Sequence, residues 1–240
     1  PFLRAALNGR EPLKNQYFGD VNDYRKYGLL RVLQQQGEGR LLVAWMLTPD
    51  DEGRDGERRS YLLQPERWRH YDPDLFDLLR SAPRRDVSLI EGSERLPGPR
   101  YYAAPVPDAR EERENWRRGL LEAARNVDLA FLDPDNGIEV PSKPVGRRGS
   151  SKYVGWSELE ALWAAGCSLL IFQHFAREAR DPFARRLLAE LAGRTGASLV
   201  GAFRSAHVLF LLAVQGRHVA RWARVGPLVS RRWQGQIESM

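Results

Sequence analysis

Continuous runs of hydrophobic residues alternate with amphipathic segments along this chain. Three runs of strand length lie at residues 41–47, 127–133 and 167–175, and shorter strand-like stretches lie at 87–91 and 100–105. Continuous apolar runs are typical of strands that are buried on both faces, as in parallel sheets covered by helices. The pattern therefore predicts a central sheet that is mostly parallel.

Most segments between these runs carry apolar residues at helical spacing. Helices are expected over residues 22–36, 73–81, 109–125, 157–165 and 181–194. Asn22 or Asp23 is expected to cap the first helix, and Gly37 is expected to end it. Ser157 followed by Glu160 predicts a capping box at the start of the fourth helix.

The chain closes with two apolar runs that no helix separates. Residues 197–215 are expected to form two strands joined by a tight turn at 204–206, and hence an antiparallel hairpin. Together these elements predict an α/β fold, with a doubly wound, mostly parallel Rossmann-like sheet that ends in this hairpin. We expect one domain over residues 1–240, with an N-terminal helical segment at 1–37 and a basic C-terminal tail at 216–240.

The composition excludes several classes of protein. A hydrophobic content of 42% is sufficient for a sizeable core, and no apolar stretch is long enough to cross a membrane. Cys167 is the single cysteine, which excludes a disulfide framework and a zinc site built on cysteines. No charged-then-apolar leader opens the sequence, so we expect a protein of the reducing cytoplasm.

The chain is basic, with 37 lysine and arginine residues against 31 acidic residues and a formal net charge of +6. A basic balance favours polyanionic partners, so we expect a nucleic acid, either RNA or DNA, and no membrane. Lysine is rare among the basic residues and occurs at Lys14, Lys26, Lys143 and Lys152. Because a compact ammonium does not substitute for a guanidinium fork, these lysines are candidates for specific contacts.

Polar side chains follow two of the apolar runs at the point where each strand would end. The segment DPDNG at 133–137 ends the run at 127–133, and the acidic segment TPDDEGRDG at 48–56 follows the run at 41–47. Turn formation alone would account for such residues. Ligands of open α/β sheets, however, bind outside the carboxyl ends of the strands, so both segments are expected to face one crevice.

Two stretches carry a resemblance to a known family. YFGDVNDYRKYGLLRVL at 17–33 precedes the first strand, and LDPDNGIE at 132–139 ends the strand before a long loop. Together with the order of the elements, they make the chain resemble the 23S ribosomal RNA adenine-amino methyltransferases of the D-P-P-Y type, which have the class I S-adenosylmethionine-dependent methyltransferase fold. The likeness in topology covers residues 17–215, with one helix between the second and third strands missing.

The sequence departs from this family at two places. Where the family has a glycine-rich turn after the first strand, this chain has an acidic segment with two spaced glycines, Gly53 and Gly56. At the catalytic motif, Asp135 and Asn136 stand where the family has proline and tyrosine. The aromatic ring that would stack on the target base is therefore missing from the motif.

The resemblance implies a nucleic-acid-modifying enzyme that transfers a methyl group from S-adenosylmethionine to the amine of a base. It implies that the cofactor is held by Asp50, Gly53 and Glu91, with Glu91 on the ribose hydroxyls. The catalytic candidates stand where strands end and are Asp133, Asp135, Asn136 and His174. A histidine in that place can act as a general base near neutral pH, or it can cap the strand through a backbone bond.

Basic and aromatic residues are mixed in the segments 146–156 and 216–234. Such a mixture suits phosphate contacts combined with base stacking, although an exposed solvated face is the alternative for any run of charge. The substrate-binding candidates are Lys26, Lys143, Arg147, Arg148 and Lys152.

Two other functions remain open. A nuclease or phosphohydrolase on the same scaffold would hold Mg²⁺ with Asp50, Asp133, Asp135 and Glu139, whereas the methyltransferase interpretation includes no metal. A non-catalytic nucleic-acid-binding protein would have lost the cofactor site. The altered glycine segment favours both of these alternatives, and the oligomeric state is left open.

Overall fold

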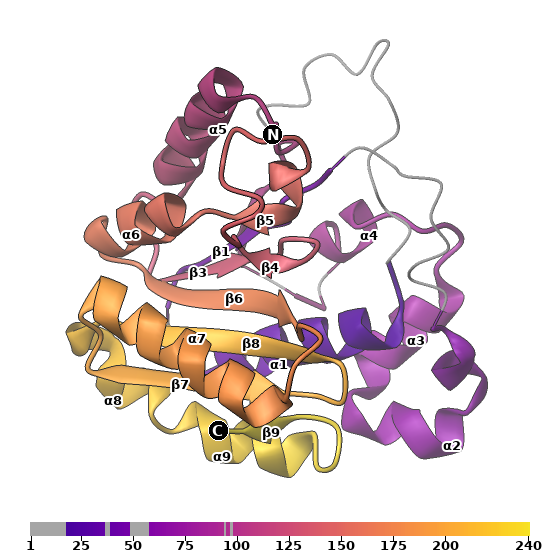
Figure 1. The fold of residues 1–240 in the computed structure, drawn as a ribbon. Coiled ribbons are helices and arrows are strands. Elements are labelled where there is room, and N and C mark those ends of the chain that lie inside the picture. The colour runs from indigo at the N-terminus through magenta and orange to yellow at the C-terminus, as the bar shows by residue number, and fades with distance from the viewer. Residues whose placement is uncertain (1–17, 37–38, 49–57, 94, 97) are drawn as a thin grey trace.

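The computed structural model describes residues 18–36, 39–48, 58–93, 95–96 and 98–240. Their main feature is a seven-stranded sheet in the order β2-β1-β3-β6-β8-β7-β9 (Figure 1). Its strands are β1 (Leu41–Ala44), β2 (Arg100–Tyr102), β3 (Leu129–Leu132), β6 (Ser168–His174), β7 (Leu199–Arg204), β8 (Val208–Val214) and β9 (Glu238–Ser239). A second, two-stranded sheet pairs β4 (Gly137–Ile138) with β5 (Tyr153–Val154).

The large sheet is mixed, with a parallel half and an antiparallel half. Strands β2, β1, β3 and β6 run parallel to one another, and β1 lies beside β3 as the apolar runs predicted. Strand β8 is antiparallel to both of its neighbours, β6 and β7, which confirms the predicted hairpin. The carboxyl ends of β1, β3 and β6 consequently open at the same edge.

Helices cover both faces of this sheet (Figure 1). The longer ones are α1 (Val21–Gln36), α3 (Pro73–Ser81), α5 (Arg110–Ala123), α6 (Trp156–Ala164), α7 (Arg180–Thr195) and α9 (Val225–Arg232). Short helical turns are α2 (Pro65–Trp68), α4 (Ser88–Glu91) and α8 (Val219–Trp222), with 3₁₀ turns η1 (Ser60–Leu63), η2 (Arg69–Tyr71), η3 (Ser150–Lys152) and η4 (Gly216–His218).

Alternate residues of the parallel strands belong to two separate cores. Leu41 and Val43 pack in the core that includes α1, α3 and α9, whereas Leu42 and Ala44 pack in the core that includes α5, α6 and α7. Successive side chains of a strand point to opposite faces, so a strand covered on both sides is apolar throughout. This is the physical reason for the continuous apolar runs.

The prediction of a strand at 87–91 is wrong, because these residues form helix α4. Asp86 accepts a hydrogen bond from the backbone N–H of Ser88 at 2.9 Å, which is an N-terminal capping contact. A short apolar run cannot be distinguished from a helical turn by its periodicity alone. The described chain therefore has one sheet strand, β2, between β1 and β3 in sequence rather than two.

Two predicted helix caps are also wrong in detail. Helix α1 is capped by Asp20, whose Oδ1 accepts from the N–H groups of Asn22 at 2.7 Å and Asp23 at 2.9 Å. Helix α6 begins at Trp156, and the acid that reaches back to its first turn is Glu158, which accepts from the N–H of Gly155 at 2.8 Å. In both cases the cap lies two or three residues before the predicted position.

The C-terminal segment is folded onto the body of the protein rather than extended as a tail. Helix α9 packs against α1, where a Cβ on Gly28 would lie 1.8 Å from the ring of Trp233. Trp222 and Trp233 are both buried, so the prediction that they stack on bases is wrong. In the part of the chain that the structure describes, no helix is long and apolar enough to cross a membrane.

Candidate functional site

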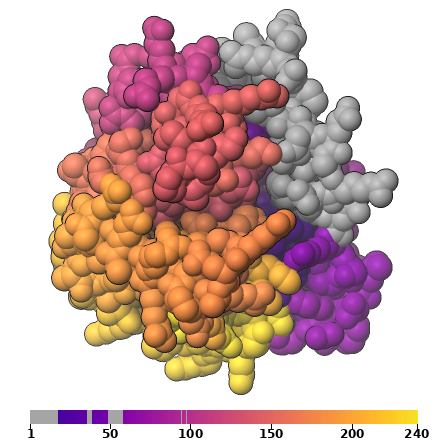
Figure 2. Space-filling model, in the orientation of Figure 1, coloured from indigo at the N-terminus to yellow at the C-terminus, as the bar shows by residue number. Residues whose placement is uncertain are grey.

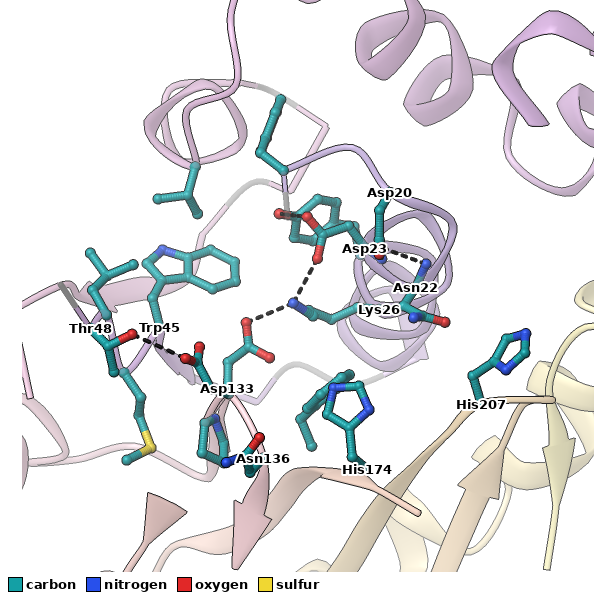
Figure 3. Close-up of a pocket in the computed structure, with 18 of the residues that line it drawn as sticks. Asp20, Asn22, Asp23, Lys26, Trp45, Thr48, Asp133, Asn136, His174 and His207 are labelled. Atoms are coloured by element: carbon teal, nitrogen blue, oxygen red, sulfur yellow. Dashed lines mark hydrogen bonds and ion pairs between the residues drawn. The ribbon is translucent and has the colours of Figure 1, made fainter. Parts of the chain in front are cut away.

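A pocket of about 410 Å³ lies at the carboxyl edge of β1, β3 and β6 (Figure 3). Its wall on the helix side comes from the start of α1, and the residues that follow β1 and β3 complete it. Four aromatic residues line it: Phe18, Tyr27, Trp45 and Phe172. The motif after β3 contains no aromatic residue, but the pocket beside the motif is rich in aromatic side chains from other elements.

Asp133 is the first polar residue after β3 and the centre of the pocket's charged network. Its backbone N–H donates to the carbonyl of Ala44 at 3.0 Å, which continues the parallel pairing of β1 with β3. Its carboxylate points toward α1, where Oδ2 accepts from Lys26 Nζ at 2.7 Å (Figure 3). Asp133 after β3 thus supplies the acid of this ion pair, and Lys26 on α1 supplies the base.

Lys26 lies between two carboxylates. Its Nζ also donates to Asp23 Oδ1 at 2.7 Å, and Asp23 Oδ2 accepts from the N–H of Gly19 at 3.1 Å and the hydroxyl of Tyr27 at 3.2 Å. Asp23, Lys26 and Tyr27 share one face of α1 because residues three and four apart are neighbours on a helix. The lysine predicted to bind substrate is therefore in the site, paired with two aspartates.

The pocket contains more carboxylates than cations. Asp20, Asp23, Asp133 and Asp135 line it together with Lys26 and Arg58. Burial raises the pKa of Asp133 to about 7 against the opposing attraction of Lys26, and burial together with Asp23 raises the pKa of Asp20 to about 6. Burial acts against the charge on Lys26, but the two paired carboxylates outweigh it and raise the pKa of the ammonium. These carboxyls therefore favour a cationic or hydrogen-donating ligand.

Asp135 and Asn136 also line the pocket, as the sequence predicted for the segment after β3. Thr48, which follows β1, donates from Oγ1 to Asp135 Oδ2 at 3.1 Å. The backbone of Asn136 is held by neighbouring elements, since its carbonyl accepts from the N–H of His174 at 3.1 Å and from Gln173 Nε2 at 3.3 Å. The ends of β1, β3 and β6 are thus bonded to one another at the site.

Gly137 allows this close approach of the loop to β6. Its φ is 124°, and a Cβ at this position would lie 2.3 Å from Oε1 of Gln173. Gln173 uses that same oxygen to accept from the N–H of Ile138 at 2.9 Å. Glycine is therefore required here by both backbone conformation and space.

Two histidines line the mouth of the pocket (Figure 3). His174 was a catalytic candidate and ends β6, whereas His207 was not among the candidates. His207 lies in the turn between β7 and β8, next to Val208, and Val208 pairs with His174 across the two strands. The antiparallel hairpin is the signal that would have placed His207 beside His174.

Other predicted site residues lie away from the pocket. Glu91 does not end a strand and does not line the pocket, but it accepts a hydrogen bond at 2.7 Å from Nε1 of Trp45, which does. Glu139 accepts from the backbone N–H groups of Trp156 at 2.9 Å and Val145 at 3.4 Å, and so it does not join Asp133 and Asp135. Asp50 and Gly53 lie outside the described residues.

The remaining substrate-binding candidates occupy a separate loop, residues 139–152, between β4 and β5. Figure 2 shows this loop on the surface of the molecule, with α7 below it. Lys143 donates to the carbonyl of Arg148 at 3.0 Å, and both Arg147 and Arg148 are exposed. These three residues and Lys152 do not line the pocket, so the structure does not bring them together with Asp133.

Backbone contacts hold this loop in place. Asp108 accepts from the N–H groups of Gly149 and Ser151, each at 2.7 Å. Behind the loop, Arg113 and Glu158 form a buried ion pair at 2.5 Å, and Arg113 also donates to the carbonyl of Tyr153 at 2.7 Å. The carboxylates near this loop thus accept hydrogen bonds from backbone N–H groups or pair with a buried arginine.

Neither cofactor nor metal contacts can be read from the sequence motifs alone. Among the described residues, no three His, Cys, Asp or Glu side chains gather in a way that could hold a metal ion. Two of the four proposed Mg²⁺ ligands, Asp133 and Asp135, do line the pocket. After β1, Met46 has a φ of 50°, an unusual backbone conformation for a residue other than glycine, and it lines the pocket.

A scan of the sequence against models of known protein families gives no match, and a search of curated proteins gives none either. The function must therefore be inferred from the geometry of the pocket.

Proposed function

We propose that this protein transfers a methyl group from S-adenosylmethionine to an amine on a nucleic acid base. The observation that carries the proposal is the position of Asp133, Asp135 and Asn136 in an aromatic, anionic pocket at the carboxyl edge of β1 and β3. In open α/β sheets, ligands bind at this edge. They bind in the crevice between the two neighbouring strands at which the strand order reverses.

The strand order supports the same proposal. Strand β8 lies between β6 and β7 and is antiparallel to both, while β2, β1, β3 and β6 are parallel. Class I methyltransferases have this arrangement; relative to them, the sheet of the described residues has no strand beyond β2 and one additional strand, β9, beside β7. The resemblance in the segments 17–33 and 132–139 points to the same fold.

The pocket has the charge that such a cofactor and substrate require. S-adenosylmethionine, when bound, supplies an electrophilic methyl group on a positively charged sulfur. Carboxylates and the faces of aromatic rings both attract cations, and here Trp45, Met46 and Thr48 after β1 would hold the cofactor opposite Asp133. A phosphate, in contrast, would be repelled by the four carboxylates inside.

Asp133 has the properties needed to accept a proton from the amine. Its Oδ2 is bound to Lys26, which leaves Oδ1 to accept a hydrogen bond from the amine. Methylation of an amine would release one proton from its nitrogen, and Asp133 would be placed to receive that proton. A carboxylate whose pKa is raised to about 7 accepts that proton readily near neutral pH.

The first test is ligand binding. S-adenosylmethionine at a hundred times its dissociation constant should stabilise the folded protein by about 2.7 kcal/mol, which thermal melting detects. Stabilisation by Mg²⁺ but not by S-adenosylmethionine would instead favour the phosphohydrolase, since Asp133 and Asp135 are present in the pocket. Binding of RNA with neither ligand would favour a non-catalytic protein.

The second test is catalysis, with labelled S-adenosylmethionine and an unmethylated 23S ribosomal RNA transcript as substrate. Asp133→Asn keeps the size of the side chain and removes its charge, and we expect turnover to fall by about 10²–10⁴-fold. Glu139→Gln is the matched control, because Glu139 lies outside the pocket and an amide oxygen can keep its backbone contacts. Equal turnover by the two variants would contradict the assignment of Asp133.

A further inference from the structure

Gln173 is a buried polar residue near the end of β6 that does not itself line the pocket. Its side-chain amide reaches the backbone of the loop after β3. Oε1 accepts from the N–H of Ile138 at 2.9 Å, and Nε2 donates to the carbonyl of Asn136 at 3.3 Å. Nε2 also donates to the carbonyl of His174 at 2.8 Å. The amide therefore binds the loop after β3 to the end of β6.

The two bonds to the loop have the pattern of pairing between parallel strands. In a parallel ladder, a residue donates to the carbonyl before its partner and accepts from the N–H after its partner. Gln173 makes both bonds around Gly137, with its side chain in place of a main chain. A Cβ on Gly137 would lie 2.3 Å from Oε1 of Gln173, so only glycine leaves room for the amide. The side chain thus extends the pairing of β6 to β4, which lies beside β6 in Figure 1.

The amide of Gln173 fits in one orientation only. The two hydrogens of Nε2 meet two carbonyls, and Oε1 meets an N–H. Rotation of the amide by 180° would place the oxygen against both carbonyls and the nitrogen against the N–H, and all three bonds would be lost. Because polar groups that are buried without partners cost free energy, these bonds hold the loop in a single position.

The loop that Gln173 holds is the polar floor of the pocket. Asp135 and Asn136 directly precede Gly137, and both line the pocket. Asp135 is also held on the side of β1 by Thr48, and the N–H of Asn136 donates to the carbonyl of Lys152 at 2.9 Å. Groups that surround a reacting amine must be placed accurately, since a displacement of about 1 Å can slow a reaction by about 100-fold.

We propose that Gln173 is a positioning residue, which sets the places of Asp135 and Asn136 in the pocket through the backbone on either side of Gly137. Gln173 acts only through the loop, because its own side chain does not line the pocket. This deepens the proposed function, on which it rests only for the reaction that the positioned residues serve.

The chain offers a matched control at the opposite end of the pair β6 and β8. Gln215 follows β8, and its Nε2 also donates to two backbone carbonyls, those of Trp163 at 2.8 Å and Cys167 at 3.3 Å. These two residues lie near the end of α6 and just before β6, and neither they nor Gln215 line the pocket. If Gln173 only supports the fold, its substitution should have the same effects as substitution of Gln215.

The first measurement requires no ligand. The pKa of Asp133, about 7, depends first on burial, and it is followed in the full chain by carbon-13 NMR of the carboxyl group. Gln173→Met keeps a similar side-chain volume and removes the three hydrogen bonds, so the loop should loosen and admit water. The pKa of Asp133 should then fall by about 1 toward its ordinary value. Gln215→Met should leave it unchanged, and a fall in both variants or in neither would overturn the proposal.

The second measurement is turnover of the methyl transfer. In Gln173→Met we expect kcat to fall by about 10–100-fold, while the KM for S-adenosylmethionine changes by less than about twofold. The reason for this split is that the residues proposed to hold the cofactor follow β1, away from the bonds that are removed. Gln215→Met should leave both constants unchanged although thermal melting shows a similar loss of stability. Equal values of kcat in the two variants would contradict the assignment.

A second substitution covers the case in which Gln173→Met does not fold. Gln173→Asn keeps the amide but is one methylene shorter, so it cannot reach the loop, and the same falls in the pKa of Asp133 and in kcat are expected. Unchanged values in this variant would overturn the proposal.

The two proposals can fail separately. If S-adenosylmethionine does not bind while the pKa of Asp133 falls only on substitution of Gln173, methyl transfer fails and the positioning role stands. If the protein methylates its substrate but substitutions of Gln173 and Gln215 are equivalent in both measurements, the positioning role fails and methyl transfer stands.

Discussion

The pocket and the loop between β4 and β5 are both irregular, charged and close to the ends of strands, yet they use their carboxylates differently. In the loop region, Asp108 and Glu139 accept hydrogen bonds from backbone N–H groups, and Glu158 pairs with a buried arginine. In the pocket, Asp133 and Asp23 share a single lysine, and Asp20 lies close to Asp23 and to that lysine.

This difference is visible in the direction of the pKa shifts. Burial acts to raise the pKa of Asp108, but the hydrogen bonds from Gly149 and Ser151 outweigh it and lower the pKa. For Asp133 burial prevails and the pKa rises to about 7. Carboxylates that stabilise a fold are satisfied in their charged form, whereas crowded carboxylates with raised pKa values are typical of functional sites.

The largest expected effect on stability is the difference between substitution of Lys26 and substitution of Lys143. Lys26→Met leaves Asp23 and Asp133 without their shared cation in a buried place, so the free energy of unfolding should fall by about 3–5 kcal/mol. Lys143→Met removes one partly exposed contact to the carbonyl of Arg148 and should change stability by about 0.5 kcal/mol or less. Urea denaturation at pH 8 measures both. Equal losses would show that the ion pairs of the pocket contribute no more to the free energy of unfolding than the contact in the loop does.

The pH dependence of stability should distinguish Asp133 from Asp108. The folded pKa of Asp133, about 7, lies above the unfolded value of about 4, so the folded state binds its proton more tightly. Asp133 therefore stabilises the protein below pH 4 and loses this contribution as the pH rises to about 7. Asp108 has a lowered pKa, so its contribution is present above about pH 4 and is lost only as the pH falls further.

The measurement is the difference in unfolding free energy between the protein and each variant at a series of pH values. This difference should fall between pH 4 and pH 7 for Asp133→Asn and stay flat for Asp108→Asn. Taking differences removes the contributions of His207 and His218, whose lowered pKa values give the opposite slope in part of this range. A flat difference for Asp133→Asn would mean that Lys26 keeps the carboxylate charged throughout.

The smallest expected effect concerns the exposed arginines of the loop. If Arg147 and Arg148 contact phosphates of a duplex, the pair of changes to glutamine should reduce the salt dependence of binding by a slope of about 1 to 2. The salt slope is measured with a duplex RNA between low and physiological salt. An unaltered slope would show that these arginines are solvent-exposed and do not contact phosphates.

The sequence predicted the sheet and the polar floor of the pocket because both follow from local patterns. Continuous apolar runs located β1, β3 and β6, and the segment after β3 placed Asp133, Asp135 and Asn136 at the correct edge. The strand at 87–91 was wrong because five residues are too few to separate a strand from a helical turn.

The rest of the site depends on contacts between distant residues, which leave no local signal. Lys26 and Asp133 are 107 positions apart, and only the packing of α1 against the sheet brings them together. Asp23 was expected as a cap and instead shares Lys26 with Asp133. The clearest missed residue is His207, whose place follows from the register of β8 beside β6 rather than from its neighbours in sequence.

The position of β8 also constrains the order in which the protein can assemble during synthesis. Strand β7 is made before β8, but it reaches the sheet only through β8, which separates it from β6. Strand β7 therefore cannot join the sheet before β8 does, and His207 reaches the mouth of the pocket only when β8 is in place. The pocket that His207 lines is therefore complete only after β8, which ends at Val214, has been made.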